Sequence, residues 1–237
     1  MLIHAAKFDG HSDLDIHART TIRYSYSYIE TTVVRIGNDT LEVSSFGEYS
    51  LNGVNNANSH PSTANTLRKS HSLPTLGGYP VYLDSFNKKK HVFDIVLGNG
   101  QNITVSNMKD IVSVAIKNGT KALFGGVEGL LGNFQGKMLA RDGITDLHDD
   151  VDALGQEWQV RDDEPMLFQA VRAPQYPELC RLPDVAAKEA RRLGEGISEE
   201  AAKAACAHLM GDINAFEACV YDVTATNDLD QAQSGAF

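Results

Sequence analysis

Five aspartates and one histidine gather between residues 142 and 152, and these are the residue types best suited to chemistry. They are Asp142, Asp146, His148, Asp149, Asp150 and Asp152. A histidine among carboxylates can bind zinc or another transition metal, or act as a base that an aspartate orients. Because no second histidine follows at helical or hairpin spacing, an acidic surface turn that leads into a strand is the simpler interpretation.

Other residues with catalytic potential give weaker signals. His4, His11 and His17 are spread along the N-terminal region, where we expect them on the surface. Trp158, the only tryptophan, is predicted to be a core residue of a strand. The chain has no Gly-x-Ser-x-Gly, His-Glu-x-x-His, phosphate-loop or Gly-x-Gly-x-x-Gly motif. The sequence therefore favours a non-catalytic protein, with a metal-dependent hydrolase built on residues 142–152 as the catalytic alternative.

The composition narrows the class of protein further. The 237 residues include 21 Lys and Arg against 31 Asp and Glu, which gives a net charge of −10 at pH 7. Such an acidic chain repels polyphosphate, so we expect no nucleic-acid partner. Hydrophobic residues make up 42% of the chain and charged residues 22%, as in globular domains. No apolar run reaches the roughly 18 to 20 residues that a membrane helix needs, so we expect no membrane span.

The elements that must position these residues begin with a succession of short strands. Leu14, Ile16 and Ala18 alternate with polar residues, which is the period of a half-buried strand. Turn signals at Gly37-Asn38-Asp39 and Gly98-Asn99-Gly100 are each flanked by apolar runs. Many short strands with regular turns predict an antiparallel β-sandwich.

Beyond this region the pattern changes to charged and proline-rich sequence and then to helices. Asp184, Ser198 and Asp212 are predicted to cap the N-termini of three successive helices. We therefore predict a mainly β chain with an α-helical tail. Its two domains are a β domain over residues 1–163 and a small helical module over residues 178–237.

Three cysteines, Cys180, Cys206 and Cys219, all lie in the last quarter of the chain. Cys206 and Cys219 fall on two segments predicted to be adjacent helices, and a disulfide between them would contribute about 3 kcal/mol of stability in the chain-entropy model. The alternative is three buried free thiols in a cytosolic protein. If the disulfide forms, Cys180 is left over, and its partner is expected outside this chain.

Three N-x-[ST] triplets, at Asn38, Asn102 and Asn118, are candidate glycosylation sites. Each falls at a predicted turn or strand edge, where a glycan can be accommodated. The N-terminus lacks the basic and then apolar pattern of a signal peptide. Because the sequence begins as though inside a strand, we expect a piece of a longer secreted chain.

Two motifs carry a family resemblance. They are Gly129-Leu130-Leu131-Gly132-Asn133-Phe134 and Leu154-Gly155-Gln156-Glu157-Trp158-Gln159-Val160. They resemble the end of a von Willebrand factor type D domain, in which a Gly-Leu-x-Gly-Asn-Phe stretch precedes an acidic loop and a Phe-Gly-x-x-Trp-x-Val closing strand. Residues 205–228 resemble a reduced eight-cysteine module, and a similar tail ends the repulsive guidance molecules.

The departures from the family pattern are as informative as the matches. The Gly-Asp-Pro-His strand with which the family usually begins has no counterpart, so we expect that strand to be missing, and autoproteolysis at an Asp-Pro bond is excluded. The family's Leu-Cys-Gly-Asn cysteine is Leu131 here. Most of the usual disulfides are therefore absent, and the core must supply more of the stability.

In this family the loop after Gly-Asn-Phe holds calcium, an ion that takes six to eight oxygen ligands. The resemblance makes Asn133 a candidate ligand, and Gln135 stands where the family usually has Asp. The next ligand positions are Leu139 and Ala140, so the site would have to be rebuilt from later carboxylates. The candidates for that role are Asp142, Asp146 and Asp149, with Asp150 and Asp152 beside them.

The resemblance implies a non-catalytic extracellular module for adhesion or matrix assembly, with calcium as its possible cofactor. Its expected partners are other extracellular proteins, glycans or further copies of the chain. A ligand-binding ectodomain fragment of the receptor type is the alternative function, because the helical tail is similar to that of the guidance molecules.

Overall fold

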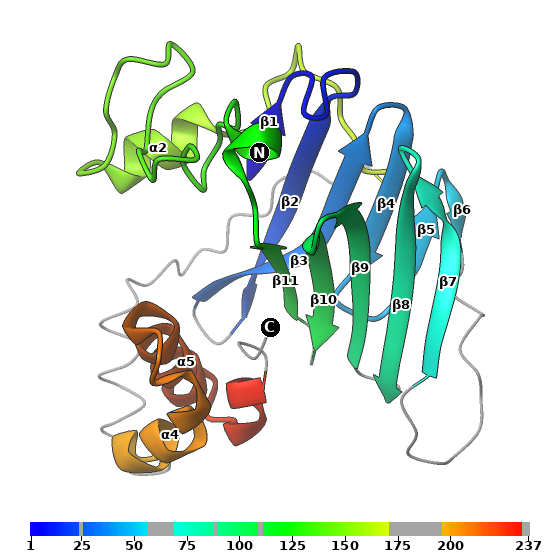
Figure 1. The fold of residues 1–237 in the computed structure, drawn as a ribbon. Helices are drawn as coiled ribbons and strands as arrows, with labels where there is room; N and C mark the ends of the chain where they lie inside the picture. Colours follow the sequence, from blue (N-terminus) through cyan, green and yellow to red (C-terminus); the bar gives the residue numbers. More distant parts are fainter. Residues whose placement is uncertain (24–25, 56–68, 88–89, 109–110, 171–195, 234–237) are drawn as a thin grey trace. The chain divides into compact units, whose positions relative to one another are not determined.

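The computed structural model describes residues 1–23, 26–55, 69–87, 90–108, 111–170 and 196–233 (Figure 1). The chain forms two compact units. The β unit contains residues 1–20 and 29–172, and the helical unit contains residues 21–28 and 173–237. Asp184 and Cys180, for which a helix cap and an external disulfide partner were predicted, lie outside the described residues.

The strands of the structure form two antiparallel sheets. The first has the order β1-β2-β3-β4-β5-β6 and contains β1 (Ile3–Ala5), β2 (Leu14–Arg23), β3 (Tyr26–Ile36), β4 (Asp39–Ser44), β5 (Tyr49–Leu51) and β6 (Val54–Asn55). The second has the order β11-β10-β9-β8-β7 and contains β7 (Lys69–Leu76), β8 (Tyr79–Asn87), β9 (Lys90–Gly98), β10 (Gln101–Met108) and β11 (Ile111–Lys117). Strands that are neighbours in each sheet are therefore consecutive in sequence.

The inner faces of the two sheets form one hydrophobic core, and this confirms the predicted β-sandwich (Figure 1). The alternation of apolar residues along β2, β3, β4, β9 and β10 places every second side chain in this core. Its most deeply buried members include Leu14, Ile16, Val34, Ile36, Leu41, Val43, Val81, Phe93, Ile95, Ile103 and Val105. Close packing of branched and aromatic side chains supplies most of the stability of such a layer.

The predicted hairpin turns are present where glycine and asparagine signalled them. Gly37 and Asn38 connect β3 to β4, with Ile36 paired to Asp39. Gly77, in the β7–β8 turn, has φ +58° and lies so close to Ile36 that an added Cβ would sit 2.4 Å from Ile36 Cγ2. Its amide donates to Asp39 Oδ2 at 2.8 Å, which joins the two sheets at this corner.

The segment after β11 differs from the prediction in one element. It contains α1 (Lys121–Phe124) and α2 (Val151–Glu157), so the closing strand expected over residues 154–160 is wrong. Asp150 caps α2 by accepting a hydrogen bond from the Ala153 amide, and Asp152 adds a negative charge to the first turn. These local signals favour a helix at the very residues that the family pattern assigned to a strand.

The helical unit contains α4 (Glu199–Ala205), η1 (Ala207–Leu209), α5 (Ile213–Thr226) and η2 (Leu229–Gln233). Ser198 caps α4 by accepting from the Ala201 amide, and Asp212 accepts from the Ala215 amide at the start of α5, as predicted. A disulfide joins Cys206 to Cys219 with their Cα atoms 6.0 Å apart. The small core around it contains Ala202, Cys206, Cys219, Val223 and Ala232.

Candidate functional site

The strongest candidate site lies on the side of β2 that faces away from the sandwich core. Asp15 and His17 alternate with the core residues Leu14 and Ile16, so their side chains point to the opposite face. They are nevertheless only 4% and 3% exposed. This burial follows from the return of the chain, because Arg141, Trp158 and Glu164 surround the same cavity as these β2 side chains. The surface location predicted for His17 is therefore wrong, whereas His11 is exposed as predicted.

Asp15 is the centre of a charged triad. Its Oδ1 lies 2.6 Å from His4 Nδ1, and its Oδ2 accepts a hydrogen bond from Arg35 Nη2. Burial alone would raise the pKa of Asp15, but the hydrogen bonds from His4 and Arg35 outweigh it and lower the pKa below its usual value. The hydrogen bond to Asp15 in turn raises the pKa of His4, against the opposing effect of partial burial. The triad therefore holds an ionised carboxylate between the Arg35 guanidinium and the His4 imidazole.

His17 lines the same cavity as the triad but differs from it in its charge. Burial lowers the pKa of His17 to about 4, and the positive charges of the Met1 amino group and Arg35 lower it further, against the carboxylates of Asp15 and Glu164. His17 is therefore a neutral imidazole at pH 7. Among the residues that the structure describes, its Nδ1 has no hydrogen-bond partner, and the same holds for Arg35 Nε.

The segment that carries Arg141, Trp158 and Glu164 covers this side of β2. Arg141 holds this covering segment together. Its Nη1 and Nη2 bond to the carboxylate of Glu164, its Nε donates to the Glu157 carbonyl at 2.9 Å, and its Nη2 donates to the Gln159 carbonyl at 2.9 Å. The guanidinium also lies 4.9 Å from the ring centroid of Trp158. Burial opposes ionisation of Glu164, but the bonds from Arg141 and the Arg161 amide lower its pKa below the usual value. One cation thus fixes the end of α2 and the turn that follows it.

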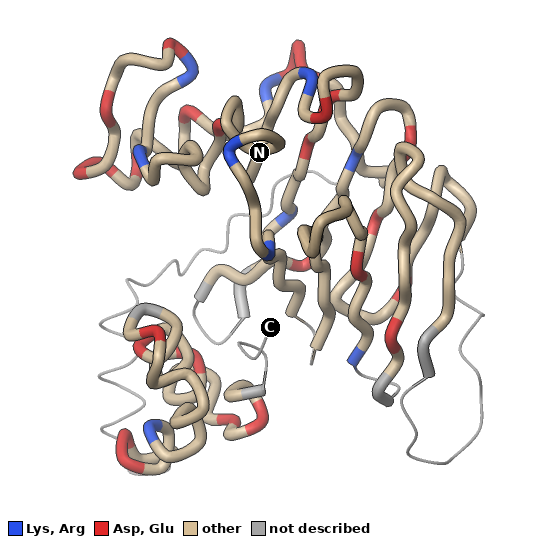
Figure 2. Tube along the Cα trace, viewed as in Figure 1, with Lys and Arg blue, Asp and Glu red and all other residues tan. Residues whose placement is uncertain are grey.

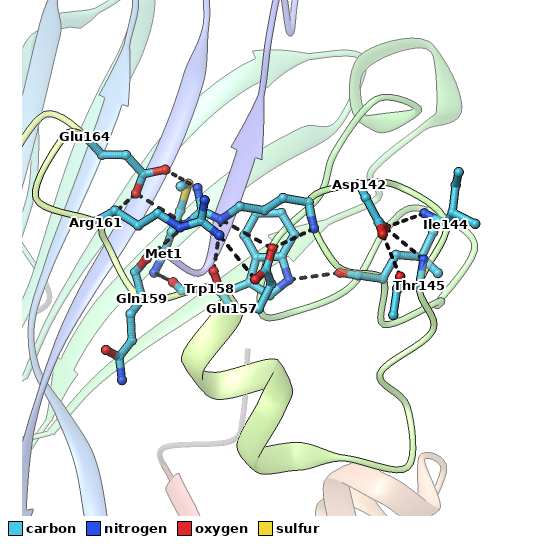
Figure 3. Close-up of polar contacts among 11 residues, drawn as sticks. Met1, Asp142, Ile144, Thr145, Glu157, Trp158, Gln159, Arg161 and Glu164 are labelled. Atoms are coloured by element: carbon cyan, nitrogen blue, oxygen red, sulfur yellow. Dashed lines mark hydrogen bonds and ion pairs between the residues drawn. The ribbon is translucent and has the colours of Figure 1, made fainter.

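Trp158 holds the same segment in place through its buried ring, its indole N–H and its backbone carbonyl. It is 2% exposed, its Nε1 donates to the Leu139 carbonyl at 3.0 Å, and its own carbonyl accepts from the Met1 nitrogen (Figure 3). Its predicted role as a core residue is therefore right, although it follows a helix and not a strand. A tryptophan with a satisfied indole N–H contributes both apolar area and a fixed orientation.

These groups enclose a cavity of about 290 Å³ in the β unit. Its lining residues are Met1, His4, Asp15, His17, Arg35, Glu128, Arg141, Trp158, Glu164, Pro165 and Leu167. Glu128 reaches the cavity because its backbone forms a bridge with that of His4. Its volume is far more than the roughly 10 to 15 Å³ that one water molecule needs, and it approaches the lower end of small-molecule sites.

The residues predicted to bind calcium occupy a separate loop, where they close turns of their own backbone. Asn133 Oδ1 accepts from the amides of Gln135 and Lys137 at 2.9 and 3.0 Å. Asp142 accepts from the amides of Ile144 and Thr145, each at 2.8 Å, and from the Thr145 hydroxyl (Figure 3). These three hydrogen bonds lower the pKa of Asp142, the hydroxyl bond having the largest effect. The side chains thus stabilise Asx-type turns.

The carboxylates of this loop do not gather at one point. Asp146 Oδ1 accepts from the His148 amide at 3.0 Å, and Asp149 is exposed. Figure 2 shows acidic positions spread along the loop. In the described part of the chain, no three His, Cys, Asp or Glu side chains are grouped as metal ligands. Gln135 lines a different pocket together with Asn133 and Lys121.

The three candidate glycosylation sites differ in access. Asn38 is exposed in the β3–β4 turn. Asn118 is also exposed, and its Nδ2 donates to the Gly100 carbonyl at 2.9 Å. Asn102 is half-buried, and its Nδ2 donates to Asp94 at 2.9 Å and to Thr104 at 3.1 Å. Because a glycan is attached through Nδ2, Asn38 is the best placed of the three.

The β2 site was missed in the sequence because its members are scattered. The alternation of Leu14 and Ile16 with Asp15 and His17 correctly puts the two polar residues on one face, and such a face is usually solvated. Only one feature of the sequence indicates that this face is buried. An aspartate and a histidine lie next to each other on one face of a strand whose opposite face belongs to the core. No local pattern connects these residues to Arg141, which is more than a hundred positions away.

The chain was also compared with known proteins. No protein-family model matches the sequence, and no curated protein matches it. In the described residues, no helix is both long enough and apolar enough to cross a membrane. The resemblance to a von Willebrand factor type D domain rests on the motifs at residues 129–134 and 154–160, the second of which forms most of α2 and its end.

Proposed function

We propose that this chain is a non-catalytic extracellular interaction module, and that it works by presenting surfaces to other proteins, to glycans or to further copies of itself. The observation that carries the proposal is the disulfide between Cys206 and Cys219, which links two helices of the helical unit. Disulfides persist in oxidising compartments and are rare in the reducing cytosol. The unit has a small core, so it depends on such a cross-link more than the β unit does.

The β unit supports the same proposal through its turns. Hairpin turns of a β-sandwich form exposed loops that commonly carry recognition residues. Asn38 offers an exposed glycosylation position in one such turn. Exposed apolar side chains at Leu131, Ile144 and Val151 add contact area on the segment after β11.

The experiment is to secrete the 237-residue chain from a eukaryotic host, purify it oxidised and immobilise it on a sensor surface. The protein itself and a panel of purified extracellular glycoproteins are then passed over that surface. We expect saturable retention of at least one of them, and loss of retention after mild reduction if the helical unit makes the contact. A Cys206→Ser/Cys219→Ser variant is the matched control. Secreted, folded protein that retains neither itself nor any glycoprotein would contradict the proposal.

Calcium binding by the loop of residues 133–152 is part of the proposal. Asn133 and Asp142 already hold the loop in closed turns, and Asp142 Oδ2, which accepts one hydrogen bond from the Thr145 hydroxyl, retains a lone pair for a cation. Thermal melts with millimolar calcium and then with chelator test this. A ligand that binds only the folded state raises the melting temperature by mass action. We expect an upward shift that disappears in Asp142→Ala but persists in Asp162→Ala, an exposed aspartate outside the loop.

A further inference from the structure

The cavity beside β2 combines hydrogen-bond donors and hydrogen-bond acceptors in its lining. The side chains of His4, His17, Arg35 and Arg141 supply donors, and those of Asp15, Glu128 and Glu164 supply acceptors. Two guanidinium groups and the Met1 amino group therefore face three carboxylates, and the charge of the lining nearly cancels.

Two buried nitrogen atoms of this lining lack a partner. His17 is 3% exposed, and neither its Nδ1 nor Arg35 Nε has a hydrogen-bond partner among the described residues. A buried polar atom without a partner is costly, and native structures usually complete it with a ligand, an ion or ordered water. Both side chains line the cavity.

The lining selects the chemistry of that group. An anion would satisfy Arg35 but would lie against Asp15, Glu128 and Glu164, and a cation would lie against the two arginines. A neutral hydroxyl group both donates one hydrogen bond and accepts two, so it can bond to a donor and to a neighbouring carboxylate at once. Pro165 and Leu167 add an apolar wall for the C–H face of a small ring.

We propose that this cavity binds one neutral sugar residue, such as the terminal hexose of an extracellular glycan. The inference rests on the proposed function in one respect, since it makes a glycan the partner of the interaction module. The cavity size fits a single ring and not an extended oligosaccharide, because about 290 Å³ is at the lower limit of small-molecule sites. The rest of a glycan would extend into solvent past Pro165, which is exposed.

Saturation-transfer NMR on the 237-residue chain tests the proposal, with glucose, galactose, mannose and N-acetylglucosamine as probes. Sodium acetate and calcium chloride serve as the charged probes. We expect at least one sugar to bind and neither charged probe to displace it. Glu128→Ala should weaken sugar binding about tenfold, as expected for the loss of a hydrogen bond to a charged group, while the exposed Glu48→Ala should not change it.

A blocking variant tests the location independently of the ionic groups. Leu167→Trp places a large ring at the cavity wall, and Ile144→Trp adds the same ring at a position that is 84% exposed. We expect sugar binding to be lost in Leu167→Trp and kept in Ile144→Trp, with both variants folded by circular dichroism. If Leu167→Trp does not fold, the comparison of Glu128→Ala with Glu48→Ala decides whether the sugar binds in this cavity.

Three results overturn the inference. They are binding of none of the four sugars, binding of acetate or calcium at the same place, and equal sugar binding in Leu167→Trp and Ile144→Trp. Failure of the proposed function looks different, because the immobilised wild-type protein would then retain no glycoprotein and no copy of itself. Retention of a glycoprotein that free sugars do not inhibit leaves the interaction module standing and removes only the sugar site.

Discussion

His17 should make the stability of the β unit fall as the pH is lowered. Its pKa is about 4 in the folded chain, chiefly because it is buried, against 6.5 for an unperturbed histidine. The unfolded chain therefore binds a proton at pH values where the folded chain does not. Stability is fully present above pH 6.5 and is lost progressively as the pH falls towards 4.

The size of this loss of unfolding free energy follows from the change in the pKa of His17 on folding. A difference of about 2.5 pKa units at about 1.36 kcal/mol per unit predicts a loss of about 3 kcal/mol of unfolding free energy between pH 7 and pH 4. The Met1 amino group, which also lines the cavity, acts in part of this range, because burial lowers its pKa from 8.0 to about 6 and its contribution is lost as the pH falls from 8 towards 6. His4, whose pKa is raised, contributes stability that is full below pH 6.5 and is lost as the pH rises above it. Asp15, whose pKa is lowered, contributes stability that is lost only below its ordinary pKa of 3.8.

The assay is urea unfolding followed by the fluorescence of Trp158, which is the only tryptophan, is 2% exposed and reports on the β unit. Wild type, His17→Phe and His11→Gln are compared at several pH values between 4 and 7. We expect the wild type and His11→Gln, an exposed histidine, to lose about 3 kcal/mol more than His17→Phe across this range. Equal pH dependence in wild type and His17→Phe would refute the reasoning, since the burial of His17 would then cost nothing.

The remaining predictions concern the covalent link, the corner of the sandwich and the covering segment. Replacing Cys206 and Cys219 by serine should destabilise the helical unit by about 3 kcal/mol, measured as a lower melting temperature of the helical circular dichroism signal, with an unchanged Trp fluorescence melt as the internal control. Gly77→Ala should destabilise the β unit by roughly 2 kcal/mol or more in urea unfolding, because the new Cβ meets β3, and Gly78→Ala, with no atom within 4 Å, should cost less. Arg141→Leu should cost roughly 2 kcal/mol and red-shift the Trp fluorescence, because its half-buried carboxylate partner loses its cation; an unshifted spectrum would contradict this.

Much of the architecture could be predicted because it is encoded locally. Apolar residues with a period of two specify strands, and the glycine and asparagine pairs at residues 37–38 and 98–100 specify where the chain reverses. Ser198 and Asp212 specify the start of helices because their side chains bond to amides only three residues away. The disulfide between Cys206 and Cys219, one of the two alternatives that the sequence left open, is present.

The family pattern misled at one element for a related reason. It assigned residues 154–160 to a strand by analogy, although Asp150 and Asp152 are local signals for the start of a helix. The burial of Trp158 was predicted correctly, since a large apolar ring is buried in either kind of element. Local capping chemistry was thus the better guide at this point.

The sequence by itself determined the strands, their turns and the caps of the tail helices, because each depends on residues close in the chain, and it left the cross-link between Cys206 and Cys219 as one of two alternatives. Only the tertiary structure decided that Asp15 and His17 are buried. Their burial requires the segment that carries Arg141, Trp158 and Glu164 to return over β2, and no short-range pattern encodes such a contact. The electrostatic states follow from that return, because water is removed from His17 while Asp15 keeps its hydrogen bonds from His4 and Arg35.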